Sequence, residues 1–378
     1  MSVSELTRRA EAPAPLPDSV PGWIGRLRRS GAQPVIAIAG SRGKTTGIHL
    51  LDAMLAAAGL RTVLWTDHGV TIAGRKQRGE LVPWTRGLAL VASGDLDLAI
   101  QELDWDTVHA VGLPEEAYPL VAVTNLCANN DACLLQDETL RAVRALRTVR
   151  AAARPGARFV LNGDDWAVAG GDHEDDPRNI LVTQSRDTPL VRTHLARGGV
   201  AAWVEAGDVH FGPAEGAATL LTVADAPISG GGLFGFQVAN LLTAAALARA
   251  CGVPAAAIAA AAASYRPDPM AIPGSFNVFA IRGATVIVDR PAPPWFMRVP
   301  LRAVGPLGPG RQVQMIGAAR PTPVDDLQET GRLLGRGAGL VVVHGETSHP
   351  ERTAAILQGI AQNDVPPAIV HAESENAA

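Results

Sequence analysis

Lysine is the residue type that this sequence most clearly lacks. The chain has 378 residues and 33 lysines and arginines, of which only two are lysines, Lys44 and Lys76. Any chemistry that needs a lysine amine is therefore confined to these two positions. Lys44 lies in the glycine-containing stretch Gly40–Thr46.

Cysteine is also scarce. The three cysteines, Cys127, Cys133 and Cys251, cannot form a disulfide framework, so a reducing compartment is expected. Cys127 and Cys133 lie six residues apart in a polar segment, but a second pair of ligand residues is missing there. A metal site at this pair is therefore disfavoured.

The sequence has no surplus of positive charge and no long apolar run. Its net charge is −4, which argues against a nucleic-acid partner held through backbone phosphates. No run approaches eighteen apolar residues, and the first 21 residues lack the apolar core of a signal peptide. We therefore expect a cytoplasmic protein with no membrane and no nucleic-acid partner.

What the sequence does contain is a glycine loop between an apolar run and an amphipathic segment. Residues 34–39 are predicted to form a buried strand and residues 47–58 a helix. Glycines let the backbone wrap closely around an anion, and the first N–H groups of a helix point toward it. Lys44 can reach the β- and γ-phosphates of a nucleotide, and the Thr45 hydroxyl can hold Mg²⁺. The predicted phosphate loop consists of Gly40, Ser41, Arg42, Gly43, Lys44, Thr45 and Thr46.

A second candidate is Glu102, which ends the apolar run 96–102. An acid at the carboxyl end of a strand beside a phosphate loop is where the Mg²⁺ of a nucleotide is usually held. On the sequence alone, a solvated glutamate at a strand end remains an equal alternative.

The order of predicted elements indicates an α/β fold with two domains. Strands and helices alternate up to about residue 170, which predicts a doubly wound, mainly parallel sheet. Residues 180–230 contain short β runs and are predicted to form a small β subdomain on the same domain. Pro267, Pro269 and Pro273 mark a linker. Beyond it, the strands predicted at residues 285–288, 312–316 and 340–343, with helical pieces between them, indicate a second α/β domain.

Several motifs along the chain resemble those of the Mur ligase family, and most nearly the Mur-ligase-like half of cyanophycin synthetase. The match covers roughly residues 30–345, and its ordered series is more specific than any single motif. The motifs are Pro34–Thr46, Thr66-Asp67 with Gly69-Val70 and Gly74, Glu102, Thr124-Asn125-Leu126, Leu161–Asp165, His194–Gly199, Val238-Ala239-Asn240, Pro273–Phe279, Val286–Asp289 and Asp325–Leu334.

The resemblance implies an N-terminal arm (residues 1–30), a Mur-type ATP-binding domain (31–268) and a shortened, Rossmann-like C-terminal domain (269–378). It implies ATP-dependent amide ligation, in which a small-molecule or peptide carboxylate becomes an acyl phosphate and an amine or amino acid then displaces phosphate. Lys44 and Glu102 would be catalytic, and Thr45 and Glu102 would hold Mg²⁺. The resemblance places Asn162 and Asp165 near the adenosine, and Asp289 in the domain that closes over the nucleotide.

The sequence also departs from the family pattern. Asn129 and Asn130 stand where the family has Asp-His, whose histidine binds a second Mg²⁺. The position of the family's carbamylated lysine falls near Leu146. Gly274-Ser275-Phe276 replaces Gly-Arg-Phe, and Phe236-Gln237 replaces His-Asn. The first metal site is therefore kept, whereas the second metal site and the contacts of the closing domain are altered.

Two hypotheses of different classes follow. The first is a working ATP-dependent ligase that uses one Mg²⁺ or substitute ligands. The second is a nucleotide-binding pseudo-ligase that acts as partner of a separate, active ligase. The intact loop and Glu102 favour the ligase, whereas the Asn129-Asn130 pair and the missing lysine favour the pseudo-ligase.

Overall fold

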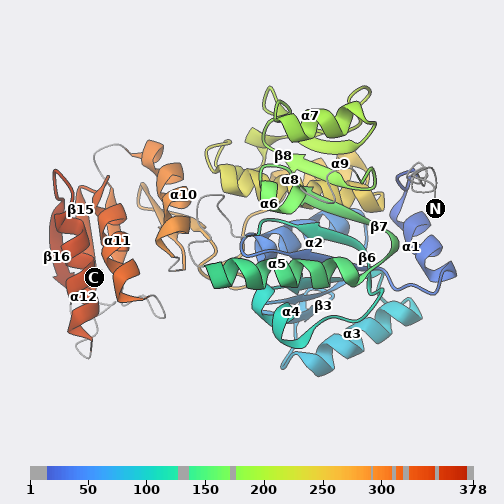
Figure 1. Ribbon diagram of the computed structural model, residues 1–378, viewed down its shortest axis with the longest axis horizontal. Coiled ribbons are helices and arrows are strands. Elements are labelled where there is room, and N and C mark those ends of the chain that lie inside the picture. Colours follow the sequence, from blue (N-terminus) through green and yellow to red (C-terminus); the bar gives the residue numbers. More distant parts are fainter. Residues whose placement is uncertain are drawn as a thin grey trace, which may run out of the picture. The chain divides into compact units, whose positions relative to one another are not determined.

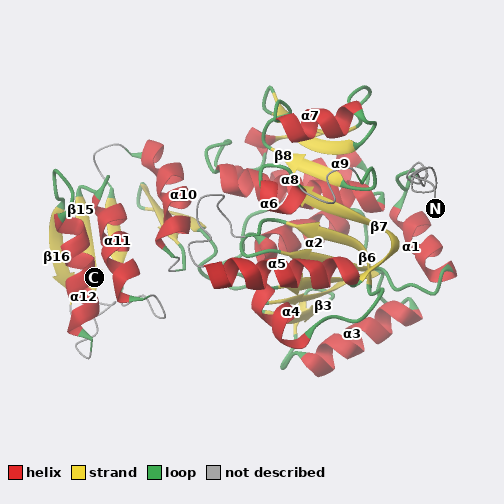
Figure 2. Cartoon of the chain, in the orientation of Figure 1, coloured by secondary structure: helices red, strands yellow, loops and turns green. Residues whose placement is uncertain are grey.

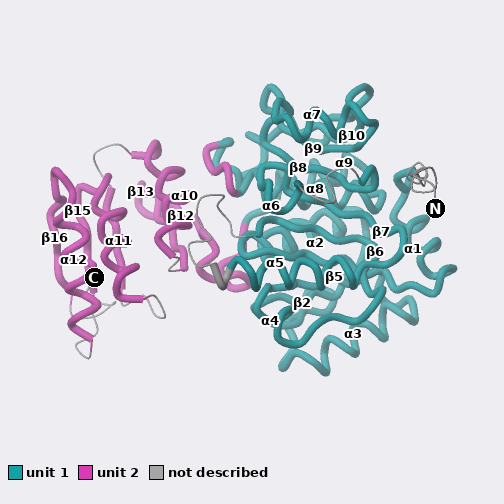
Figure 3. Tube along the Cα trace, viewed as in Figure 1, with its two compact units in different colours: residues 1–232, 237–266 teal, residues 233–236, 267–378 magenta. Residues whose placement is uncertain are grey.

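The chain folds into two compact units (Figure 3). The computed structural model describes residues 15–126, 136–170, 176–290, 293–308, 312–317, 323–344 and 349–372. The first unit comprises residues 1–232 and 237–266, and the second comprises residues 233–236 and 267–378. The division of the chain at residue 268 into an ATP-binding domain and a closing domain stays a prediction. Cys127, Cys133, Asn129 and Asn130 lie outside the described residues.

The first unit is built on one eleven-stranded sheet, in the order β11-β10-β9-β8-β7-β6-β1-β5-β2-β3-β4 (Figure 1). Strand β1 pairs in parallel with β5 on one side and with β6 on the other. The strand order therefore reverses beside β1, which in open α/β sheets is where ligands bind. The strands are β1 (Val35–Ala39), β2 (Thr62–Thr66), β3 (Gly69–Ile72), β4 (Arg75–Lys76), β5 (Leu98–Leu103), β6 (Tyr118–Val123), β7 (Ala153–Asn162), β8 (Ile180–Thr183), β9 (Val200–Glu205), β10 (Asp208–Gly212) and β11 (Ala218–Thr222).

Helices cover both faces of this sheet (Figure 2), as expected for strands that are apolar on both sides. One apolar core gathers α1 (Val20–Arg29), α2 (Lys44–Ala57), α8 (Gly235–Cys251) and α9 (Ala255–Ser264). The other gathers α3 (Leu81–Ser93), α4 (Trp105–Val111), α5 (Gln136–Ala151), α6 (Trp166–Ala169) and α7 (Pro189–Ala196). The expectation of a mainly parallel α/β sheet is confirmed. Among the described residues no helix is both long and apolar enough to cross a membrane.

The short β strands expected at residues 180–230 are present on the same domain, but they continue the main sheet and do not form a small subdomain of their own. Strand β8 pairs in parallel with β7 and β9, and β10 and β11 continue from β9 as antiparallel strands of the same sheet. Strand β9 shows why: Ala202 is buried in one core, whereas Ala201 and Trp203 are buried in the other. A strand that is buried on both faces belongs inside a covered sheet, not in an appended one.

The second unit holds two smaller sheets. Strands β14 (Val313–Ile316), β15 (Leu340–His344) and β16 (Ala368–Ala372) form a three-stranded parallel sheet, accompanied by α11 (Val324–Gly335) and α12 (Pro350–Ala361). The strand expected at residues 285–288 pairs instead in an antiparallel hairpin, β12 (Asn277–Ile281) with β13 (Ala284–Val288), ahead of α10 (Pro294–Val304). Short 3₁₀ turns lie at Val223–Asp225, Pro227–Ser229 and Gly305–Leu307.

Helices α11 and α12 pack with their backbones in close contact. A methyl group on Gly359 would overlap the carbonyl oxygen of Gln328, and one on Gly331 would overlap that of Ile356. Because both obstacles are backbone atoms, they cannot move aside as a side chain can. The second unit therefore depends on glycine at these two positions.

We predict that Gly359→Ala lowers the free energy of unfolding of the second unit by about 1–3 kcal/mol, the usual cost of an overpacked contact. Gly337→Ala is the matched control, because nothing lies within 4 Å of the added methyl group there. Urea denaturation followed by circular dichroism measures both. Equal midpoints for the two variants would contradict the close packing.

Candidate functional site

The predicted strand, loop and helix lie at the carboxyl end of β1. The strand ends at Ala39 and α2 begins at Lys44. Gly43 stands at the N-cap with a left-handed backbone (φ 80°), and no side chain caps the helix. The first N–H groups of a helix have no partner within it. Here they are available to an anion, together with the positive end of the helix dipole.

A neighbouring segment holds the loop in shape. The Asn125 Oδ1 accepts hydrogen bonds from the backbone N–H groups of Ser41 and Arg42, both at 3.1 Å, and from the Ser41 hydroxyl at 2.7 Å. The Asn125 Nδ2 and the Thr124 hydroxyl donate to the Arg42 carbonyl at 3.0 and 2.7 Å. The N–H groups of Ser41 and Arg42 are thus engaged within the protein, which leaves anion binding to the start of α2.

Two loop glycines are required by close approach as well as by backbone conformation. A methyl group on Gly40 (φ 143°) would overlap the Thr124 hydroxyl, and one on Gly43 would overlap the Asn240 Oδ1. Asn240 lies on α8 and donates from its Nδ2 to the Gln237 Oε1 at 2.9 Å. Asn125 and Asn240 belong to motifs of the family resemblance, but their sequence context alone indicated no role for them. The structure shows that Asn125 holds the loop through hydrogen bonds and that Asn240 lies directly against Gly43.

The structure brings Glu102 to the loop. In the parallel register of β1 and β5, Glu102 lies opposite Ile38, two residues before Gly40. Its Oε1 lies 3.5 Å from the Lys44 Nζ, and the two side chains are only 3% and 7% exposed. The Thr45 hydroxyl lies within hydrogen-bonding distance of both Glu102 carboxylate oxygens, at 2.9 and 3.0 Å. Glu102 is therefore not a solvated residue at a strand end.

Burial raises the pKa of the Glu102 carboxyl, and nearby Asp67 adds to this effect. The Lys44 ammonium opposes it, as do the hydrogen bonds from the Asp67 N–H (3.1 Å) and from the Thr45 hydroxyl. The positive charge of Lys44 beside Glu102 therefore favours the ionised form of this buried carboxyl.

A carboxylate and a hydroxyl oxygen side by side are donors that Mg²⁺ accepts. The described residues contain no group of three or more His, Cys, Asp or Glu side chains placed to hold a metal ion. Thr45 and Glu102 therefore fit a magnesium ion that takes its remaining ligands from water and from substrate phosphates, as is usual for this metal.

Asn162 and Asp165 both fasten the segment that supports the loop. The Asn162 Nδ2 donates to the Thr124 carbonyl at 2.7 Å, and the Asp165 Oδ2 accepts from the Leu126 N–H at 2.9 Å. The Asp165 Oδ1 also caps α6 by accepting from the Ala167 N–H. Burial raises the pKa of the Asp165 carboxyl. Both side chains act on the loop through residues 124–126, and their contact with adenosine stays a prediction.

Asp289 lies in the second unit and holds a strained turn there. Its Oδ1 accepts from the backbone N–H groups of Phe276 and Arg290, at 3.1 and 3.0 Å. Phe276 has φ 53°, a left-handed conformation that is costly for an aromatic residue. The proposed role of Asp289 toward a nucleotide is not tested by these contacts.

The position expected for the family's lysine is occupied by a core residue. Leu146 on α5 is 5% exposed and packs in an apolar cluster with Ala142, Ala145 and Val149. This residue provides packing and no charge. The asparagines at the expected second metal site, Asn129 and Asn130, lie outside the described residues.

Comparison with known proteins identifies relatives among ligases. No family model matches the chain. It is 24% identical over 341 residues to cyanophycin synthetase of Trichormus variabilis, covering 88% of this chain and 38% of that protein. It is 28% identical over 290 residues to UDP-N-acetylmuramoylalanine–D-glutamate ligase of Streptomyces avermitilis, covering 72% of this chain and 54% of the ligase. The chain thus spans less than two fifths of the length of that cyanophycin synthetase.

Solved structures show the same fold. MurF from Acinetobacter baumannii matches 93% of this chain and 70% of its own, with a TM-score of 0.57 and 17% identity. Folylpolyglutamate synthase of Mycobacterium tuberculosis, complexed with ADP and AMPPCP, matches 94% of this chain and 86% of its own, with a TM-score of 0.57 and 15% identity. At these identities the likeness concerns the α/β fold alone.

We predict that Gly43→Ala weakens nucleotide binding at least about tenfold. The added methyl group overlaps Asn240 and strains a left-handed residue by about 1–2 kcal/mol. Gly59→Ala is the matched control, because Gly59 has the same φ of 80° but open space around it. Calorimetric titration with Mg·ADP compares the variants. Equal affinities would show that the contact between the loop and α8 does not matter for binding.

Proposed function

We propose that this chain, a protein of the Mur ligase family, is an ATP-dependent ligase that joins a carboxylate to an amine. The observation that carries the proposal is the buried group of Lys44, Thr45 and Glu102 at the uncapped start of α2. This arrangement combines a fixed cation, a helix N-terminus and two oxygen donors beside one loop. It suits the phosphates of a nucleotide better than any neutral ligand.

Each part of the site has a separate task in this proposal. The N–H groups at the start of α2 and the Lys44 ammonium bind the phosphates and offset the negative charge that builds up during transfer. Thr45 and Glu102 hold Mg²⁺, which when bound neutralises the phosphate oxygens. Gly40, Ser41, Arg42, Gly43 and Thr46 shape the loop. Asn162 and Asp165, in residues 31–268, are proposed to lie near the adenosine, and Asp289, in residues 269–378, is proposed as a nucleotide-binding residue of its own unit.

The proposed reaction has two steps. A carboxylate oxygen of the acceptor attacks the γ-phosphorus of ATP, and the bond to ADP breaks, which gives an acyl phosphate. The neutral amine then attacks the acyl carbon, phosphate leaves with the electrons of the C–O bond, and the nitrogen releases a proton. Lys44 remains beside the phosphoryl oxygens throughout, so that the charge is stabilised in both transition states.

The relatives support this reaction class. Two of them are named as a synthetase and a ligase, and a solved structure of the same fold contains ADP and AMPPCP. The substrates of these two relatives do not identify the substrates of this chain, because the chain spans only part of each relative. We propose a small-molecule or peptide carboxylate as acceptor and an amino acid or amine as donor, in the cytoplasm, with or without a separate ligase partner.

Leu146 stands where the family has a negatively charged, carbamylated lysine. Because its side chain fills an apolar cluster, no carbamylated lysine supplies a negative charge at that point. We therefore propose catalysis with the single Mg²⁺ held at Thr45 and Glu102.

We predict that a mixture of amino acids and short acidic peptides stimulates phosphate release from ATP by the full chain. Hydroxylamine added to the same mixture, without an amine substrate, should give a hydroxamate, because it intercepts an acyl phosphate. Phosphate release is measured colorimetrically and hydroxamate by mass spectrometry. If nucleotide binds but no mixture stimulates release, the chain is a nucleotide-binding pseudo-ligase and the proposal is wrong.

Lys44→Ala should abolish nucleotide binding, since it removes the cation and leaves Glu102 as an unpaired buried carboxylate. Lys76→Ala is the matched control, because Lys76 is the other lysine of the chain and lies exposed on β4. Equilibrium dialysis with Mg·ATP measures both. Tight binding by the Lys44 variant would contradict the proposed phosphate site.

A further inference from the structure

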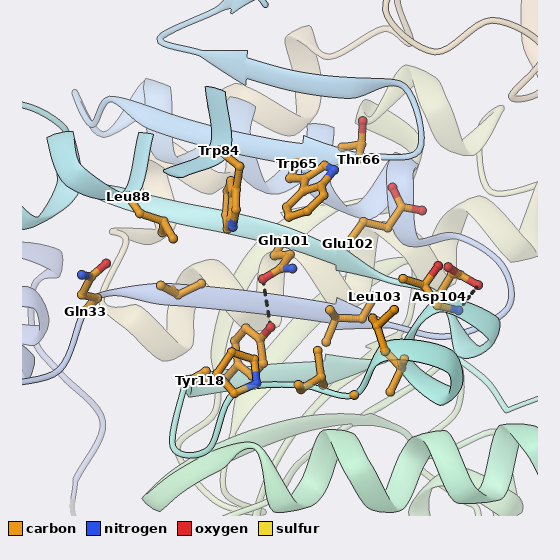
Figure 4. Close-up of a pocket in the computed structure, with 18 of the residues that line it drawn as sticks. Gln33, Trp65, Thr66, Trp84, Leu88, Gln101, Glu102, Leu103, Asp104 and Tyr118 are labelled. Atoms are coloured by element: carbon orange, nitrogen blue, oxygen red, sulfur yellow. Dashed lines mark hydrogen bonds between the residues drawn. The ribbon is translucent and has the colours of Figure 1, made fainter. Parts of the chain in front are cut away.

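A groove of about 820 Å³ opens on one face of the sheet of the first unit, between α3 and α4 (Figure 4). Its floor is formed by β1, β2 and β5, and it runs along these strands. One end lies at Glu102 and Asp104, and the other at Gln33. The groove therefore begins beside the carboxylate that faces Lys44.

The packing of α3 leaves this face uncovered. A methyl group on Gly87 would lie 2.5 Å from the Val63 Cγ2, so the missing side chain lets α3 press closely against β2. Helix α4, on the other side, has only seven residues. The helices thus cover the edges of this part of the sheet and leave the strands between them accessible.

The groove contains hydrogen-bond donors that no described residue satisfies. Trp84 is 7% exposed, its Nε1 points into the groove, and it has no hydrogen-bond partner in the described part of the chain. The Gln101 Oε1 accepts from the Tyr118 hydroxyl at 2.9 Å, while the Gln101 Nε2 has no partner among the same residues. Two donors therefore face the same space and fit the oxygens of a carboxylate.

Apolar surface lines the space next to these donors. The ring of Trp65 lies 5.3 Å from that of Trp84, measured between centroids. Leu88 of α3 and Val108 of α4 extend the apolar lining on the two sides. A ligand that fills the groove therefore needs an apolar part beside its polar groups.

The charges of the groove are mostly negative. Asp67 and Asp104 lie at the Glu102 end, and Glu80 and Glu116 are further lining carboxylates. None of these four makes an ion pair with a described residue, and Arg154 is the single arginine among the described residues of the lining. This surplus of carboxylates attracts a cation.

We propose that the groove binds the amine substrate, and that this substrate is an amino acid with an apolar side chain. Its ammonium group lies at the Asp67 and Asp104 end, its carboxylate receives hydrogen bonds from Trp84 and Gln101, and its side chain packs on the apolar lining. The inference rests on the proposed ligase function, because it identifies the class of the amine. An amine held at this end lies next to the site where the acyl phosphate forms.

Calorimetric titration of the full chain tests each recognition element separately. L-Phenylalanine and L-leucine should bind saturably, while 2-phenylethylamine (no carboxylate) and 3-phenylpropionate (no ammonium) should each bind at least about tenfold more weakly, as expected for a lost charge-assisted hydrogen bond. The proposal is overturned if all four compounds bind with equal affinity, or if none of them binds.

Variants locate the binding in the groove. Trp84→Phe keeps an aromatic ring but removes the donor, and should weaken L-phenylalanine binding about tenfold. Trp166→Phe is the matched control, because Trp166 is 61% exposed and lies outside the groove. Asp67→Asn removes a carboxylate proposed to face the ammonium group and should also weaken binding, whereas Asp225→Asn makes the same change at an exposed position outside the groove. Equal effects of test and control variants would overturn the assignment.

The two proposals fail in different ways. If L-phenylalanine binds as described but no carboxylate stimulates phosphate release, the groove assignment stands and the ligase function fails. If amino acids stimulate phosphate release with unchanged KM in Trp84→Phe, the ligase function stands and the groove assignment fails.

Discussion

The site depends on one buried charge pair, Lys44 with Glu102. A carboxylate that is 3% exposed is costly unless a cation lies beside it, and removing either partner leaves the other uncompensated. The pair exists only because β1 and β5 are parallel neighbours in one particular register and because α2 starts directly after the loop. Sheet order, loop length and the start of the helix are thus linked to a single electrostatic requirement.

The local parts of this arrangement could be predicted from the sequence. The apolar run before Gly40, the glycines and the helical spacing after Lys44 are short-range signals, and the structure has the expected strand, loop and helix. Glu102 could be placed at a strand end for the same reason. The order of motifs also indicated the family, which the relatives support independently of any single residue.

The long-range parts could not be predicted in this way. The sequence does not show that β9 to β11 continue the main sheet, because short strands broken by turns have the same pattern in an appended subdomain. Nor does it show that Asn125 and Asn240 meet the loop, since their partners are 83 or more residues away. The groove beside Trp84 results from the packing of α3 and α4, for which a linear pattern contains no signal.

The position of β1 in the sheet also has a consequence for the order in which the protein folds. Both strands that flank β1 come later in the chain, and the contacts of the loop extend to Asn125 and finally to Asn240 on α8. During synthesis, the loop Gly40–Thr46 leaves the ribosome early and stays without its neighbours until most of the first unit has followed. Since distant contacts form slowly, we expect the predicted phosphate loop to be among the last features of the first unit to become ordered.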